Sequence, residues 1–201
     1  MVFIALKSIG ISGVPGTGKT TIARKLSEYL DIPVIDLSEY AIRNMLVITY
    51  DISTQSYIID EEKLQRSVVD IYKDKGPLII DSHYVEILPR EIFEIVFILR
   101  RDPEELLNIL LSRGWSPKKV AENVEAELLS VCTINAIEEL GEDIVVEIDT
   151  TNRSVDDIVK ETIDILFGDK SIYYGYRIDW LAILPNDKIE RLIRIIEINN
   201  I

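Results

Sequence analysis

Cysteine and histidine are almost missing from this 201-residue chain, and its basic residues are outnumbered by acidic ones. The single cysteine, Cys132, cannot form an internal disulfide, and we expect a buried, unreactive thiol. There are 22 lysines and arginines against 35 acidic residues, giving a net charge of −13. This balance argues against general nucleic-acid binding, which depends on a basic face. A basic protein is the expected kind of macromolecular partner.

Long hydrophobic runs are absent as well. No apolar run approaches the roughly 18 residues that a transmembrane helix needs, and the apolar start at residues 1–7 is too short for a signal peptide. We therefore expect no membrane attachment and a cytoplasmic location. With 47% hydrophobic and 28% charged residues and no low-complexity tract, the composition is typical of a globular protein. The length allows one domain, or one domain with appendages.

A phosphate-binding loop lies near the amino terminus, at residues 13–21. Two glycines five positions apart are followed by a lysine and a threonine, which completes the pattern G-x-x-x-x-G-K-[ST]. Glycines let backbone N–H groups approach phosphate oxygens, the lysine supplies a positive charge, and the threonine hydroxyl can ligate Mg²⁺. The loop therefore predicts binding of ATP and Mg²⁺, with candidate residues Gly13, Gly16, Thr17, Gly18, Lys19, Thr20 and Thr21.

Predicted strands and helices alternate along the chain, and the loop lies between a strand and a helix, as its chemistry requires. This alternation predicts a three-layer α/β fold with a five-stranded parallel sheet and helices on both faces. We expect residues 45–56 to be an irregular insert and the tail from 168 to end in a helix, either packed on the body or serving as a docking or dimer surface. The expected strands are 3–11, 33–37 (buried), 77–81, 93–99 and 145–149, and the main helices are 21–30, 38–44 (capped by Ser38), 60–75, 104–113, 117–140 (with Val131 facing inward) and 155–167.

Two polar residues follow the strand at 77–81, at the sheet edge where parallel α/β proteins bind ligands. Asp81 is suited to hold Mg²⁺ or its water beside the loop threonine, although an acid after a strand can also be only a helix cap. His83, the single histidine, could orient an attacking water or an acceptor phosphate, or could be structural.

A break at residues 114–117 looks like a mobile cover, with Arg113 on one side and Lys118 and Lys119 on the other. A closing arginine can neutralise charge on a phosphoryl group in transfer and exclude water. We therefore list Arg113 as a candidate catalytic residue; the alternative is a solvated helix end.

Four motifs together resemble the atypical adenylate kinases of the isoenzyme-six type, whose eukaryotic members act in small-ribosomal-subunit maturation. They are the loop at 13–21, Asp-Ser-His at 81–83, Ile-Val-Phe-Ile-Leu-Arg-Arg-Asp at 95–102 and Ser-Arg-Gly-Trp-Ser-Pro-Lys-Lys at 112–119. The resemblance runs almost without gaps from about Ile9 to Phe167.

The resemblance implies a nucleoside monophosphate kinase domain at 1–167, with a monophosphate-binding segment at about 36–60, a short lid at about 112–122 and a C-terminal extension at 168–201 outside the family core. It implies transfer of the γ-phosphate of Mg-ATP to AMP, together with ATPase activity and a role in ribosomal RNA maturation. By position, Asp81 and His83 match the family's Asp-x-His, Arg113 matches the lid arginine, and Arg153 falls where the ATP adenine is contacted. The implied partner is the basic platform ribosomal protein of the S-eleven family.

The segment at 38–55 departs from the family pattern, so the acceptor is not fixed by the resemblance. Arg43 is either a monophosphate contact or a surface arginine. Three activities stay open: an adenylate kinase, a ribosome-assembly ATPase that binds a basic ribosomal protein, and a kinase with a hydroxyl acceptor such as a nucleoside or shikimate.

Overall fold

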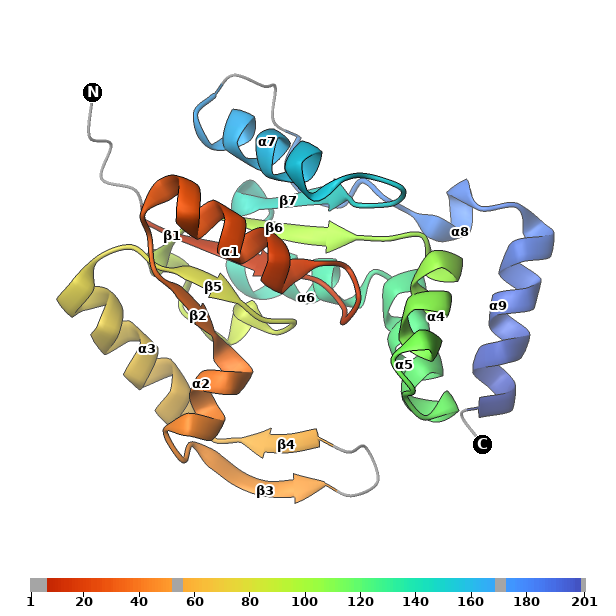
Figure 1. The fold of residues 1–201 in the computed structure, drawn as a ribbon, viewed down its shortest axis with the longest axis horizontal. Helices are drawn as coiled ribbons and strands as arrows, with labels where there is room; N and C mark the ends of the chain where they lie inside the picture. Colours follow the sequence, from red (N-terminus) through yellow and green to blue (C-terminus); the bar gives the residue numbers. More distant parts are fainter. Residues whose placement is uncertain (1–6, 52–55, 169–172, 200–201) are drawn as a thin grey trace.

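A five-stranded parallel sheet forms the centre of the molecule, with strand order β2-β5-β1-β6-β7 (Figure 1). The structure, a computed structural model, describes residues 7–51, 56–168 and 173–199. Residues 3–6, the start of the first predicted strand, lie outside that part. The strands are β1 (Ser8–Ser12), β2 (Val34–Asp36), β5 (Ile79–Asp81), β6 (Phe93–Arg100) and β7 (Val145–Asp149). The predicted fold class is confirmed.

Helices cover both faces of the sheet. Successive residues of a strand point to opposite sides, and in these strands apolar residues occupy both sides, so both faces have to be covered. Ile79 and Phe97 pack with the helices α1 and α7, whereas the next residues, Ile80 and Ile98, pack in a second core on the other face. That second core includes residues of α3, α5 and α6. The helices are α1 (Lys19–Leu30), α2 (Leu37–Arg43), α3 (Glu61–Lys75), α4 (Pro103–Ser112), α5 (Pro117–Leu128), α6 (Val131–Leu140) and α7 (Val155–Leu166), with 3₁₀ turns η1 (Val85–Ile87), η2 (Arg90–Ile92) and η3 (Glu142–Ile144).

The helix predicted over 117–140 is two helices, so that prediction was wrong. The chain breaks at Ser130, which has a φ of 58°, and Val131 is 38% exposed rather than inward. The cause is Arg100, which is buried at the end of β6 and donates to Glu127 Oε1 (2.9 Å) and to Ser130 Oγ (2.8 Å). It also pairs with the buried Glu147. Satisfying a buried guanidinium requires several oxygens in a fixed arrangement, and a straight helix does not supply them.

Part of the predicted irregular insert at 45–56 is regular, and its residues 52–55 lie outside the described part. The strands β3 (Val47–Asp51) and β4 (Ser56–Ile59) form an antiparallel hairpin, set apart from the main sheet (Figure 1). Most of its side chains are exposed on both faces, so no alternation of polar and apolar residues marks it as a strand pair. Two further details differ nearby. Strand β2 is a half-buried edge strand, and α2 is capped by Asp36, which accepts from the N–H of Glu39, rather than by Ser38.

The C-terminal extension packs on the body. Helices α8 (Trp180–Ile183) and α9 (Asn186–Asn199) lie beside α4 and α5 (Figure 1). Trp180 is buried and donates to Glu127 Oε1 at 2.7 Å, and Lys188 pairs with Asp102 at 2.6 Å. Across the described residues, no helix combines the length and apolarity that crossing a membrane requires.

Candidate active site

The loop at residues 13–18 connects β1 to α1 and adopts a backbone that only glycine tolerates at several positions. Gly13, Gly16 and Gly18 have φ values of 129°, 102° and 101°. A Cβ on Gly13 would lie 2.4 Å from the carbonyl oxygen of Leu99 in β6. The glycine is therefore required both by its dihedral and by the close approach of two strands' ends.

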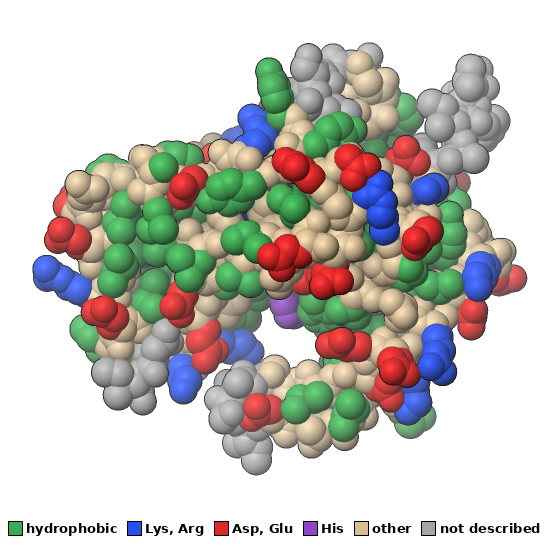
Figure 2. Space-filling model, turned by 180° about the vertical axis from the view of Figure 1, so that it is seen from behind, with side chains coloured by type: hydrophobic (Ala, Val, Ile, Leu, Met, Phe, Trp, Pro, Cys, Tyr) green, Lys and Arg blue, Asp and Glu red, His purple; other side chains and the backbone are tan. Residues whose placement is uncertain are grey.

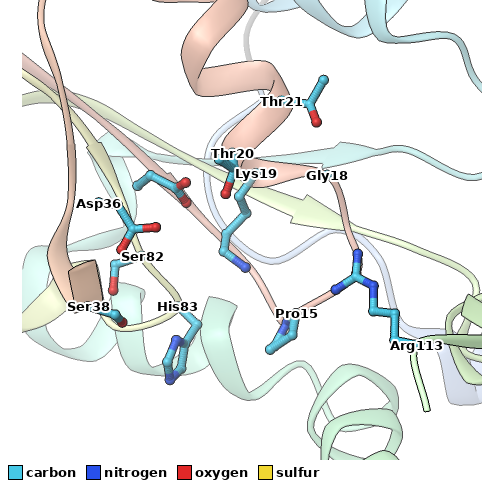
Figure 3. Close-up of a pocket in the computed structure, with 12 residues that line it drawn as sticks. Pro15, Gly18, Lys19, Thr20, Thr21, Asp36, Ser38, Ser82, His83 and Arg113 are labelled. Carbon is cyan, nitrogen blue, oxygen red and sulfur yellow. The ribbon is translucent and has the colours of Figure 1, made fainter. Parts of the chain in front are cut away.

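The loop borders a cleft of about 260 Å³ at the carboxyl ends of β2 and β5 (Figure 3). Residues from four separate parts of the chain meet there: the loop with the start of α1, the end of β2 with the start of α2, the end of β5, and the C-cap of α4. They are Pro15, Gly16, Gly18, Lys19, Thr20, Thr21, Asp36, Ser38, Asp81, Ser82, His83 and Arg113. The structure thus brings together most of the site residues predicted from sequence.

Lys19 extends along the loop into the cleft (Figure 3). Its Nζ donates to the carbonyl of Val14 at 3.1 Å. Burial lowers the pKa of Lys19, and the negative charge of Asp81 partly offsets that effect. A partly desolvated ammonium interacts more strongly with a phosphate than one in bulk water.

Asp81 is the most buried acid of the cleft, at 2% exposure. The Thr20 hydroxyl donates to this carboxyl, and Oδ2 has no hydrogen-bond partner among the described residues. Burial raises the pKa of Asp81, and the nearby Asp36 adds to the increase. A buried carboxylate oxygen without a partner is energetically costly, and binding of a hard cation would offset that cost. The neighbouring threonine hydroxyl offers a second oxygen ligand.

Asp36 is a cleft residue that we did not predict. It ends β2 directly opposite Asp81 in the parallel register, and both side chains line the cleft. The signal in the sequence was an acid at the end of a predicted strand, the same signal that identified Asp81. In the described residues no three His, Cys, Asp or Glu side chains form a complete metal site. Mg²⁺ does not need one, because it keeps several waters and binds through one or two carboxylates and substrate phosphates.

His83 lies at the mouth of the cleft, with its ring edge-on to Tyr84 at a centroid distance of 4.5 Å. Partial desolvation of the imidazole, followed by the charge of Lys19, lowers the pKa of His83 to about 4. The ring is therefore neutral near pH 7. Behind it, Cys132 is buried, as expected, and burial raises the pKa of its thiol to about 12, so little thiolate forms near neutral pH.

Arg113 is the C-cap residue of α4 and lines the cleft as an exposed residue. Arg153 does not line the cleft. Its guanidinium contacts Glu161 at 2.5 Å and the carbonyl of Asp149 at 3.0 Å, so an adenine contact stays a prediction.

The other two candidates, Gly13 and Thr17, belong to the loop but do not line the cleft. The Thr17 hydroxyl donates to the carbonyl of Val14 at 2.9 Å and so stabilises the loop.

A second cavity, of about 570 Å³, adjoins the cleft and shares Ser38 and His83 with it. Figure 2 shows the single histidine in the hollow between the body and the hairpin. The remaining lining residues come from α2, the hairpin, the starts of α3 and α5, and the segment between β5 and η1: Ile42, Ser56, Tyr57, Ile58, Ile59, Glu61, Lys119 and Tyr84. Sequence reasoning missed Tyr57, Tyr84 and Lys119 as lining residues.

Arg43 does not reach either cavity. It is exposed and pairs with Glu39 at 2.6 Å within α2, and it lines a separate shallow depression. This position agrees with Arg43 as a surface arginine rather than as a monophosphate contact.

Comparison with known proteins matches a family profile and several archaeal proteins. The profile described as AAA domain matches residues 9–130. A Methanocaldococcus jannaschii protein is 40% identical over 158 residues, covering 79% of this chain and 85% of the relative. A Methanococcus maripaludis protein is 37% identical over 179 residues, covering 86% and 94%. Both bear the name "Putative adenylate kinase".

Two solved structures show the same fold at low sequence identity. Shikimate kinase from Acinetobacter baumannii, in complex with shikimate, has a TM-score of 0.57 at 17% identity and covers 84% of this chain and 97% of its own. Deoxyadenosine kinase from M. mycoides has a TM-score of 0.54 at 15% identity and covers 80% and 99%.

Proposed function

The chain belongs to the family of archaeal adenylate kinase homologues with an AAA domain, and on that premise we propose that it transfers the γ-phosphate of ATP to AMP, forming two ADP. Its homologues and its kinase fold support nucleotide kinase activity. The observation that carries the proposal is the pair of adjoining cavities: a phosphate-binding cleft and a larger cavity beside it, meeting at Ser38 and His83. A donor and an acceptor can meet at that junction.

On the donor side, the N–H groups of loop 13–18 and the ammonium of Lys19 hold the β- and γ-phosphates of ATP. Thr20 and Asp81 would hold Mg²⁺, directly or through water, and the second carboxylate, Asp36, lies next to them. Mg²⁺ held there would offset the negative charge of the phosphates.

On the acceptor side, an oxygen of the AMP phosphate attacks the γ-phosphorus in line. The bond between that phosphorus and the β–γ bridging oxygen breaks, which leaves ADP at both positions. A phosphate needs no general base, so the neutral His83 serves to orient the acceptor or a water. Arg113 neutralises charge on the transferred group when the lid at 112–122 closes.

The decisive experiment measures ADP and free phosphate from Mg-ATP with and without AMP. We expect ADP to form far faster with AMP. An equal rate in both conditions, with one phosphate released per ADP, would instead identify an ATPase. Omitting Mg²⁺ should abolish turnover in either case.

A hydroxyl-acceptor kinase is a second candidate, and the position of Asp36 favours it. A hydroxyl must lose a proton during attack, and a carboxylate lining the cleft could accept that proton. A panel of nucleosides, shikimate and nucleoside monophosphates separates the two candidates, because only the hydroxyl-acceptor kinase should use compounds without a phosphate.

A role in small-ribosomal-subunit maturation is the other part of the proposal. The net charge of −13 supports binding of a basic protein such as the S-eleven platform protein, with residues 1–167 as the kinase domain and 168–201 as an extension packed on it. Binding of that protein should weaken as salt rises.

A further inference from the structure

We propose that Lys119, in the first turn of α5, binds the phosphate of the acceptor. This inference rests on the proposed function and deepens it, because it assigns a specificity-determining residue to the second cavity. Lys119 lines that cavity together with residues of the hairpin.

The distribution of positive charge around the two cavities points to this lysine. Lys19 and Arg113 are the cations in the described lining of the phosphate cleft, and Lys119 is the cation in the described lining of the second cavity. An AMP phosphate is an anion brought close to the anionic γ-phosphate of ATP. Such an approach needs a cation on the acceptor side as well as on the donor side.

The lysine is held in a position that suits this role. Its Nζ lies 4.7 Å from the centroid of the Trp115 ring, and the residue is half-buried. Lys119 and His83 line the second cavity together, and His83 lines the phosphate cleft as well. The ammonium is therefore close to the junction where the two phosphates meet.

The rest of the second cavity suits a nucleoside rather than a second phosphate. Ile42, Ile58 and Tyr57 supply apolar and aromatic surface, and Glu61 would repel an anion. AMP is thus oriented with its phosphate toward Lys119 and His83 and its base toward the hairpin. Arg43 pairs with Glu39 outside the cavity, so it is not placed to bind the AMP phosphate, and Lys119 in the expected lid is.

The test compares the wild type with Lys119→Met, Lys119→Arg and Lys118→Met. Lys118 is the matched control, since it is the neighbouring lysine of the same turn and does not line either cavity. Steady-state kinetics give KM for AMP and for ATP, and calorimetry gives Kd for AMP and for adenosine without turnover. Thermal unfolding checks that all four proteins are folded.

For Lys119→Met we expect KM and Kd for AMP to rise about tenfold or more, with KM for ATP and Kd for adenosine changed less than about twofold. Arginine should restore most of the AMP affinity, and Lys118→Met should match the wild type. An unchanged Kd for AMP in Lys119→Met, or an equal loss for adenosine, would overturn the inference alone. A wild type that neither binds AMP nor responds to it would reject the proposed function as well.

Discussion

The two ends of the proposed active site are built in different ways. The donor end consists of buried strand ends and a glycine loop whose backbone is fixed by close contacts, as with Gly13 against Leu99. The acceptor end consists of the first turn of α5 and a two-stranded hairpin whose side chains are mostly exposed. Changes at the donor end should therefore affect both folding and chemistry, whereas changes at the acceptor end should affect affinity with little cost in stability.

Removing the charge of the donor end should have the largest effect on turnover. We expect Lys19→Met to lower kcat by about 10²–10³-fold, because one charged contact to the transferred phosphate is lost. The control is Lys25→Met, since Lys25 lies further along α1, is half exposed and pairs weakly with Glu28 at 3.8 Å. A Lys19→Met protein with turnover near that of Lys25→Met would place the donor phosphates elsewhere.

Gly13→Ala should test whether the donor end is fixed by its backbone. The added Cβ would meet the carbonyl of Leu99 at 2.4 Å in a conformation with φ of 129°, so we expect a loss of about 2–5 kcal/mol in the free energy of unfolding. Gly168→Ala is the matched control, because its φ is 76° but nothing lies within 4 Å of the added Cβ. It should lose only about 1–2 kcal/mol. Equal losses in chemical denaturation would show that the close approach does not matter.

The same contrast explains which parts could be predicted from sequence. The donor end follows from local patterns: glycine spacing, a lysine–threonine pair and an acid at a strand end. The sheet, the loop and Asp81 follow from these local patterns. Asp36 carries the same signal, an acid at a strand end, but that β2 pairs with β5 and places it opposite Asp81 is known only from the strand order.

The resemblance pointed to residues 36–60 and 112–122 for the acceptor, but the particular residues that line the second cavity and the break at Ser130 could not be predicted, because their causes are distant in the chain. The hairpin is exposed on both faces and so has no periodic signal, while Lys119 and Tyr57 meet in one cavity only after folding. The break at Ser130 depends on Arg100, 30 residues away in sequence. Both segments of 117–140 are helical, as their periodicity predicted, but the chain interrupts the helix at Ser130, where it supplies oxygens to the buried guanidinium.

Substitutions in the hairpin test the expectation that the acceptor end determines affinity at little cost in stability. Tyr50 and Tyr57 contact each other edge to face at 5.0 Å and are exposed to a similar degree, but only Tyr57 lines the described cavity. Each change to serine should cost about 0.5–1.5 kcal/mol of stability at most. We expect Tyr57→Ser to raise KM for AMP about fivefold or more through lost stacking on the base, and Tyr50→Ser to leave it within about twofold. Matching KM values in the two variants would remove the hairpin from the acceptor site.

The smallest effect expected comes from protonation of His83, at the junction of the two ends. It can be measured because the chain has one histidine. Its imidazole signal in proton NMR should titrate with a pKa of about 4 instead of the usual 6.5. Between these values the unfolded chain binds a proton that the folded chain does not, so this residue lowers stability as the pH falls from about 6.5 to about 4. Stability is unaffected by it above that window.

His83→Gln should remove that contribution, so the melting temperature of the variant should fall less than that of the wild type between pH 6.5 and 4. Binding of a non-hydrolysable ATP analogue should raise the pKa of His83, because phosphates near the junction favour the imidazolium. A pKa near 6.5 in the free protein would mean that the imidazole is more solvated than the structure places it, and a pKa that does not change with the analogue would mean that His83 is separated from the bound phosphates. In that case the two cavities would not share a junction, and the acceptor would have to reach the donor by another route.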